Sequence, residues 1–251
     1  MIREDSRSAG QMLFYLYTCL IEHSPMRPRA GKNGIYQGGE VEALIRPAQP
    51  KDAPEVTVLM YMAGKSHLQT SVYDLMFPGD LEETLEKLRG LYTANVRSWF
   101  HYSHFLVSEV DGKAVATLCG YNELESGGHK VRDALMELGM DRAEWSSLKQ
   151  RMQPFYRVNP KHPEDAWVLE AVAVFPPYRG NGLIQGLLRE ILEIGKRRGY
   201  RHAELRMFIG NESARRAYEK AGFIAAEERV DPEFEKIFAS PGMVRMVKEL
   251  Y

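Results

Sequence analysis

The feature that most constrains the fold is a nearly continuous apolar run, AWVLEAVAVF, at positions 166–175. A strand has this composition when both of its faces are covered by other parts of the protein. The run leads into the turn Tyr178-Arg179-Gly180-Asn181-Gly182 and then into an amphipathic segment from Leu183 to Arg198, which Gly199 closes. A covered strand, a glycine turn and an amphipathic helix together predict an α/β domain.

Hydrophobic periodicity extends this prediction along the chain. Strands are expected at 40–46, 104–110, 113–121, 203–208, 225–230 and 243–250, and helices at 52–64, 80–96 and 212–221. Asp111-Gly112 is a favoured hairpin turn, so the sheet is antiparallel around it. The strand signal disappears from 122 to 165, where 131–138 and 145–152 are expected as short helices. We therefore expect an N-terminal extension and linker at 1–40 and one domain at 41–251. Its helical insertion at 122–165, between the third and fourth strands, is a candidate lid.

Composition excludes several classes of protein. The formal net charge is −1, with 33 basic and 34 acidic residues, so no overall basic field favours nucleic acid or anionic lipid. Two cysteines exclude a disulfide framework and a four-cysteine zinc site, and they favour a reducing, cytoplasmic setting.

The apolar run Met12 to Ile21 is about half of the roughly 20 residues that a membrane-spanning helix needs. It also lacks the flanks of a signal peptide. Two interpretations stay open: residues 1–25 form a short docking helix, or translation starts at Met26.

The glycine turn before Leu183 is a candidate pyrophosphate cradle. Two glycines let backbone N–H groups approach an oxyanion closely, at the positive end of a helix. A plain tight turn is the alternative. The turn is no Walker A motif, because no Gly-Lys-Ser/Thr follows, and no dinucleotide fingerprint, because Gln185 occupies the third glycine position.

Two segments carry a resemblance to a known family. VAVFPPYRGNG at 172–182 and NESARRAYEKAGF at 211–223 resemble the GCN5-related N-acetyltransferase (GNAT) family, strongly over 166–223 and more loosely over 41–121. The resemblance implies a mixed, mostly antiparallel sheet flanked by helices, acetyl-coenzyme A as co-substrate and no metal. It also implies an amine acceptor, and homodimers are common in the family.

The turn departs from the family pattern Arg/Gln-x-x-Gly-x-Gly/Ala at one position. Arg179 and Gly182 fit, whereas the last small residue is replaced by Ile184. A β-branched side chain here can crowd a pyrophosphate. We expect coenzyme A binding to survive, because the contacts are backbone N–H groups.

The resemblance also implies individual roles. Backbone groups of Val172 and Val174 would hold the pantetheine arm, the turn would hold the pyrophosphate, Asn211 would contact the cofactor and Tyr218 would face its sulfur. The cofactor-binding residues expected on this basis are Val172, Ala173, Val174, Arg179, Gly180, Asn181, Gly182, Leu183, Ile184, Asn211, Ser213 and Tyr218.

Glu170 and Tyr218 are the candidate catalytic residues. Strand alternation places Glu170 on the face of Val168, Val172 and Val174, and a carboxylate in apolar surroundings suits the acceptance of an ammonium proton. The alternative is a structural ion pair with an arginine such as Arg206. A phenol, with a reference pKa of about 10, can protonate a thiolate whose thiol has a pKa of about 8.5. The alternative for Tyr218 is a core aromatic residue.

Other polar and aromatic residues support weaker hypotheses. Cys119 is expected in the core, and His101 and His104 lack a third metal ligand. An acceptor pocket can be lined by aromatic and apolar residues of the first helices and the insertion, although ordinary packing explains each of them equally well: Tyr61, His67, Tyr73, Met76, Phe77, Trp145, Phe155 and Tyr156.

The sequence thus predicts an N-acetyltransferase that transfers acetyl from acetyl-coenzyme A to a primary amine of a small molecule or peptide, by direct attack in a ternary complex. A non-catalytic acyl-coenzyme A sensor and a nucleotide-binding module are the alternatives. The insertion favours a small or enclosed acceptor over a folded protein surface. No nucleic acid or membrane partner is expected.

Overall fold

One sheet organises the molecule. The computed structural model describes residues 35–36 and 41–251, so the expectations for residues 1–25 lie outside the described residues. The sheet order is β1-β2-β3-β4-β5-β6-β8-β7, and its neighbours are antiparallel except for β5 and β6. The strands are β1 (Ile35–Tyr36), β2 (Ala43–Pro47), β3 (Phe105–Val110), β4 (Lys113–Tyr121), β5 (Trp167–Val174), β6 (His202–Phe208), β7 (Ile224–Val230) and β8 (Gly242–Glu249). The predicted fold class, a mixed and mostly antiparallel α/β sheet, is confirmed.

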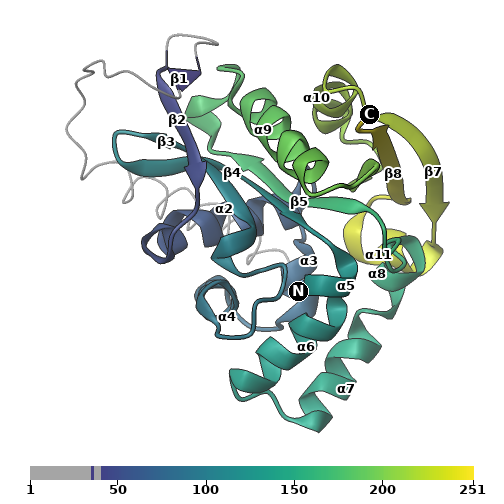
Figure 1. Cartoon of the computed structure of the whole chain (residues 1–251). Coiled ribbons are helices and arrows are strands. Elements are labelled where there is room, and N and C mark those ends of the chain that lie inside the picture. Colours follow the sequence, from purple (N-terminus) through teal and green to yellow (C-terminus); the bar gives the residue numbers. More distant parts are fainter. Residues whose placement is uncertain (1–34, 37–40) are drawn as a thin grey trace.

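Helices cover both faces of this sheet (Figure 1). One face carries α2 (Ala53–Lys65), α3 (Val72–Met76) and α4 (Leu81–Thr93), and the other carries α9 (Leu183–Arg197). Helix α9 lies very close to the sheet, because a Cβ at Gly195 would come within 2.5 Å of the Trp167 ring. The Trp167 indole donates to the Ile191 carbonyl at 3.0 Å. The covered strand and the amphipathic helix predicted from the sequence therefore pack on each other.

The parallel strands β5 and β6 separate halfway along their length. Their ladder pairs Trp167–Leu169 with Ala203–Leu205 and ends there. At the same point β5 contains a bulge, since Cys119 opposes Glu170 whereas Thr117 opposes Ala173. Ala171, inside the bulge, has a φ of 53°. An opening between two central strands thus begins at Glu170.

The bulge corrects one expectation. Simple alternation placed Glu170 on the face of Val172 and Val174, but the extra residue inverts the alternation beyond Ala171. Ala173, which opposes Thr117, is the residue of this part of β5 that shares the face of Glu170. Alternation fails here because it assumes an unbroken ladder.

The insertion between β4 and β5 is helical, as predicted. Two of its helices, α6 (Gly128–Glu137) and α7 (Arg142–Arg151), match the predicted pair, and α5 (Glu123–Ser126) and α8 (Gln153–Val158) were not predicted. The sequence analysis also missed α3 and α11 (Pro232–Phe238). In Figure 1 the insertion extends beyond one end of the sheet. Residues of the insertion border the opening between β5 and β6. Helix α10 (Glu212–Lys220) follows β6.

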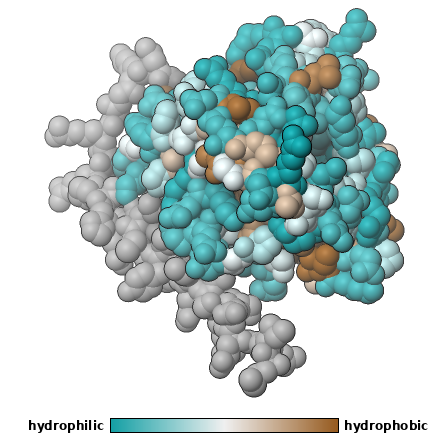
Figure 2. Space-filling model, turned by 90° about the horizontal axis from the view of Figure 1, so that it is seen from below, coloured by the Kyte–Doolittle hydropathy of each residue, from teal (hydrophilic) through white to brown (hydrophobic). Residues whose placement is uncertain are grey.

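One face of the molecule is mostly hydrophilic, with small, separate apolar patches (Figure 2). Among the described residues, exposed large apolar side chains include Leu138, directly after α6, and Ile224 and Val230, at the two ends of β7. Within the described residues, no helix is both long enough and apolar enough to cross a membrane.

Candidate functional site

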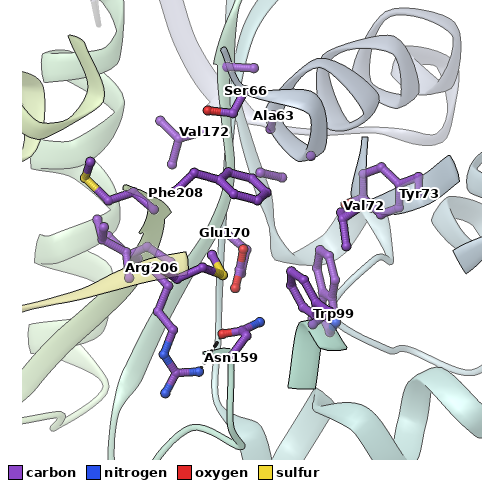
Figure 3. Close-up of a pocket in the computed structure, with 18 of the residues that line it drawn as sticks. Ala63, Ser66, Val72, Tyr73, Trp99, Asn159, Glu170, Val172, Arg206 and Phe208 are labelled. Atoms are coloured by element: carbon purple, nitrogen blue, oxygen red, sulfur yellow. Dashed lines mark hydrogen bonds between the residues drawn. The ribbon is translucent and has the colours of Figure 1, made fainter. Parts of the chain in front are cut away.

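The opening between β5 and β6 leads into a cavity of about 930 Å³. Its walls come from the end of α2, from α3, from the second half of β5, from β6 and α10, and from the insertion helices α6, α7 and α8. Figure 3 shows Glu170 near the middle of this space, between Trp99 on one side and Arg206 on the other. Its volume is within the range of about 300–1,000 Å³ usual for small-molecule sites.

The glycine turn forms a cradle next to the cavity. Gly180 and Gly182 have φ values of 80° and 72°, a backbone conformation that other residues adopt only with strain. A Cβ built on Gly180 meets no atom within 4 Å, so the space above this backbone is open. The first turn of α9 directs unpaired N–H groups toward its N-terminus, since the ladder of the helix begins with Gly186 N–H donating to the Gly182 carbonyl. Open space, free donors and the helix dipole fit a pyrophosphate.

The open edge of β5 supplies further backbone donors. Phe175 N–H donates to the Val115 carbonyl at 3.0 Å, on the β4 side. Successive N–H groups of a strand point to opposite sides, so those of Val172 and Val174 point to the open edge. This arrangement fits an extended, amide-containing arm lying along β5.

Helix α10 borders the same cavity from the other side. Asn211 begins the helix, accepting from Ala214 N–H at 3.0 Å and donating to Ser66 Oγ at 2.7 Å. Tyr218 lines the cavity and is 7% exposed. Burial, and secondarily the charge of Glu170, raise the pKa of its phenol, so Tyr218 is protonated at neutral pH.

Glu170 is the carboxylate at the centre of the cavity. Its side chain is 26% exposed, and its Oε1 lies 3.6 Å from His162 Nε2. Burial raises the pKa of Tyr73 and of Tyr121, and the negative charge of Glu170 adds to both shifts. Glu170 is therefore close enough to the phenols of Tyr73, Tyr121 and Tyr218 to influence their titration.

His162, from the end of the insertion, joins Glu170 to a buried carboxylate. Its Nδ1 contacts Glu204 Oε1, and Glu204 has no exposed surface. Burial acts to lower the pKa of His162, but the contacts with Glu170 and Glu204 outweigh it and raise the pKa. Arg245 Nη1 donates to Glu204 Oε2 at 3.1 Å, and Arg206 Nη2 lies 3.6 Å from Oε1. The ion-pair partner of Glu170 is thus His162, whereas Arg206 pairs with Glu204 and points away from Glu170 in Figure 3.

Most of the residues predicted for the site do gather in the cavity. Those that line it are Glu170, Val172, Ala173, Val174, Arg179, Ile184, Asn211, Ser213 and Tyr218. Gly180, Asn181 and Gly182 lie in the adjoining turn, and Leu183 is 2% exposed, so its side chain belongs to the core.

The acceptor side differs in detail from the prediction. Of the predicted candidates, His67, Tyr73, Met76, Trp145, Phe155 and Tyr156 line the cavity. Tyr61 and Phe77 are buried and do not line it. The sequence analysis missed Trp99, His162 and Glu204. Of these three, only Glu204 could have been noticed in the sequence, because it is a carboxylate within a strand that is expected to be covered.

The remaining reactive side chains lie elsewhere. Cys119 is fully buried, as predicted, and burial raises the pKa of its thiol. His101 Nδ1 lies 2.7 Å from Ser103 Oγ, and His104 Nε2 lies 3.1 Å from Ser126 Oγ. Among the described residues, no three His, Cys, Asp or Glu side chains gather as a metal site would require.

Comparison with known proteins identifies the family. The model of the acetyltransferase (GNAT) family matches residues 71–223, which is more than half of the chain. The protein therefore belongs to the GNAT acetyltransferase family. The match ends at Phe223, the last residue of the resemblance found in the sequence.

A curated relative supports this assignment over a shorter stretch. The uncharacterized N-acetyltransferase YycN of Bacillus subtilis (strain 168) is 31% identical over 64 residues, which are 26% of this chain and 41% of the relative. The alignment thus spans less than half of the length of that relative.

Solved structures show the same fold. An N-acetyltransferase from Staphylococcus aureus Mu50 superposes with a TM-score of 0.60 at 24% identity, over 82% of this chain and 100% of the other. A GCN5-related N-acetyltransferase from Kribbella flavida gives a TM-score of 0.51 at 14% identity, over 82% and 97% of the two chains. At these identities the likeness concerns the fold alone.

Proposed function

We propose that the protein is an acetyl-coenzyme A-dependent N-acetyltransferase, with a primary amine of a small molecule or peptide as acceptor. The observation that carries the proposal is that the open edge of β5, the glycine cradle, Glu170 and Tyr218 all adjoin one cavity. Bound acetyl-coenzyme A supplies the activated acyl group. A cytoplasmic location and a single domain from residue 41 to 251 remain part of the proposal.

The residues act in sequence on the acceptor. Glu170 accepts one proton from the bound ammonium, directly or through water, and so frees the nitrogen lone pair. The amine then attacks the thioester carbonyl while the Val174 N–H donates to the oxygen, where negative charge develops. Tyr218 protonates the departing sulfur, and the second proton lost by the nitrogen restores the Tyr218 hydroxyl. The products are an amide and a free thiol, with one proton released.

Direct attack makes a kinetic prediction. Both substrates must be bound together, so initial rates measured over a grid of acetyl-coenzyme A and amine concentrations should give intersecting double-reciprocal lines. Thiol release should require the amine, and mass spectrometry should find the N-acetyl product. Parallel lines would contradict the ternary complex. Acetyl-coenzyme A binding without thiol release, over a broad panel of amines, would instead favour the non-catalytic sensor.

A further inference from the structure

The acceptor half of the cavity is walled by a continuous series of aromatic rings. Tyr73 meets Phe100 edge-on with 6.0 Å between ring centroids, and Phe100 stacks on Trp99 at 3.7 Å. Trp99 in turn stacks on Tyr121 at 5.9 Å, and Tyr121 lies edge-on to His162 at 6.4 Å. All five rings line the cavity. In Figure 3, Tyr73 and Trp99 lie on the side of the cavity that faces Glu170.

Glu170 offers its carboxylate to an acceptor within these walls. Glu123 and Glu170 are the two carboxylates among the described residues that line the cavity. Glu123 Oε1 accepts the Gly128 N–H at 3.2 Å, whereas the ion-pair partner of Glu170, His162, is 3.6 Å away. An ammonium group is attracted both to a carboxylate and to the faces of aromatic rings. Glu170 and the aromatic wall therefore form a site for one organic ammonium group, next to the edge of β5 where the thioester is expected.

The insertion makes the far end of the cavity apolar. Its lining side chains there are Trp145 and Leu148 from α7, Met152 between α7 and α8, and Phe155 from α8, and Met76 of α3 lines the same cavity. Leu148 and Met152 are buried. Lys149, which also lines the cavity, belongs to α7 like Trp145 and Leu148, so a second cation on the acceptor would be repelled near this end. This end of the cavity therefore suits an acceptor molecule whose body is uncharged and apolar.

We infer that the acceptor is a small primary monoamine with an apolar, ring-sized body, whose ammonium group lies between Glu170 and the aromatic wall and whose body lies against Trp145. This inference rests on the proposed function and narrows its acceptor class. Polyamines, hydroxylated short amines and peptide N-termini are disfavoured, since each brings a second charge or polar amide groups into the apolar end.

Binding and turnover should be measured separately. The first assay is calorimetric titration of 2-phenylethylamine, putrescine, ethanolamine and a glycine tripeptide into the protein saturated with coenzyme A. The second is thiol release from acetyl-coenzyme A with the same four amines. The apolar body should favour 2-phenylethylamine by about ten-fold or more in both affinity and kcat/KM, as contacts of one or two carbon groups already do in an apolar pocket.

A variant pair tests the location of the body. Trp145→Ala should lower kcat/KM for 2-phenylethylamine by about ten-fold and leave that for ethanolamine nearly unchanged. Leu138→Ala is the matched control, because Leu138 ends a neighbouring insertion helix, is exposed and does not line the cavity. It should leave both values unchanged. Equal losses for both amines in Trp145→Ala would contradict the assigned location.

The outcomes separate this inference from the proposed function. Selective binding of 2-phenylethylamine with thiol release supports both. Selective binding without release of thiol supports the acceptor site and overturns the transferase. Preference for putrescine, ethanolamine or the peptide overturns the inference while the transferase stands, and failure of all four amines to bind overturns the inference as well.

Discussion

Glu170→Gln should separate a catalytic from a structural role for this carboxylate. Glutamine keeps the shape of the side chain and an oxygen that can accept from His162, but it cannot take a proton from an ammonium group. The lost ion pair is 3.6 Å long and partly buried, because the side chain of Glu170 is 26% exposed and that of His162 is 6% exposed. His162 keeps Glu204 as a partner, so no buried charge is left unpaired, and the loss should cost about 1–2 kcal/mol, equivalent to less than about 8 °C in Tm for a domain of this size.

The effect on turnover should be far larger. Removing a general base costs about 10²- to 10⁴-fold in rate, equivalent to about 3–5 kcal/mol of activation free energy. Turnover would be followed by thiol release across a pH series, and stability by thermal melting of the same samples. The acidic limb of the wild-type pH–rate profile should disappear in the variant.

Glu109→Gln provides the control. Glu109 is in the same sheet and its Oε2 accepts from Arg46 Nε at 2.6 Å, but it lies away from the cavity. This variant should lose stability without losing turnover. The reasoning is refuted if Glu170→Gln lowers Tm strongly, like a broken structural pair, while its turnover and acidic limb stay unchanged.

Three further predictions concern the cradle, the phenol and the buried histidine. Gly180→Ala and Gly112→Ala impose similar backbone strain, since both glycines have a φ of 80° and open space at the Cβ position, so both should lose about 1–2 kcal/mol of stability. Calorimetry should find weaker coenzyme A binding only for Gly180→Ala. Equal coenzyme A affinities of the two variants would contradict the proposal that this turn binds the pyrophosphate. Tyr218→Phe should lower kcat by about 10²-fold with unchanged acetyl-coenzyme A affinity, and full activity would exclude Tyr218 as the acid. The raised pKa of His162 implies stabilisation that is complete below about pH 6.5 and is lost as the pH rises through the folded-state value. The Tm of His162→Asn should therefore lie below that of the wild type by an amount that shrinks with rising pH. A constant or growing difference would contradict the claim that the ion pairs of His162 with Glu170 and Glu204 stabilise the fold.

The parts of the fold that sequence could predict are those with long periodic patterns. The strand at β5 and the helix α9 have an apolar run and an apolar stripe that only burial explains. The hairpin of β3 and β4 was marked by Asp111-Gly112, whose φ values of 49° and 80° are those of the favoured turn. The residues proposed for the cofactor side could be predicted from two local motifs, because a turn and one helix carry most of them.

The missed features have no such pattern. Helices α3 and α11 are too short for periodicity, and their only signals are the caps at Ser71 and Asp231. The bulge at Ala171 is invisible because alanine, unlike glycine, does not mark a positive φ. Trp99 reaches the site from a segment far from β5 in sequence, and His162 lies in the irregular segment just before β5, so only the tertiary fold shows that both adjoin the cavity around Glu170.

Calorimetric titration of acetyl-coenzyme A into the whole protein, followed by addition of primary amines to the same cell, tests the central claim most directly. The account predicts binding in the micromolar range, no comparable affinity for ATP or NAD, and thiol release that starts only when amine is added. Absence of binding in the wild type, restored by Ile184→Gly, would contradict it, because the cradle would then be blocked by the side chain that departs from the family pattern.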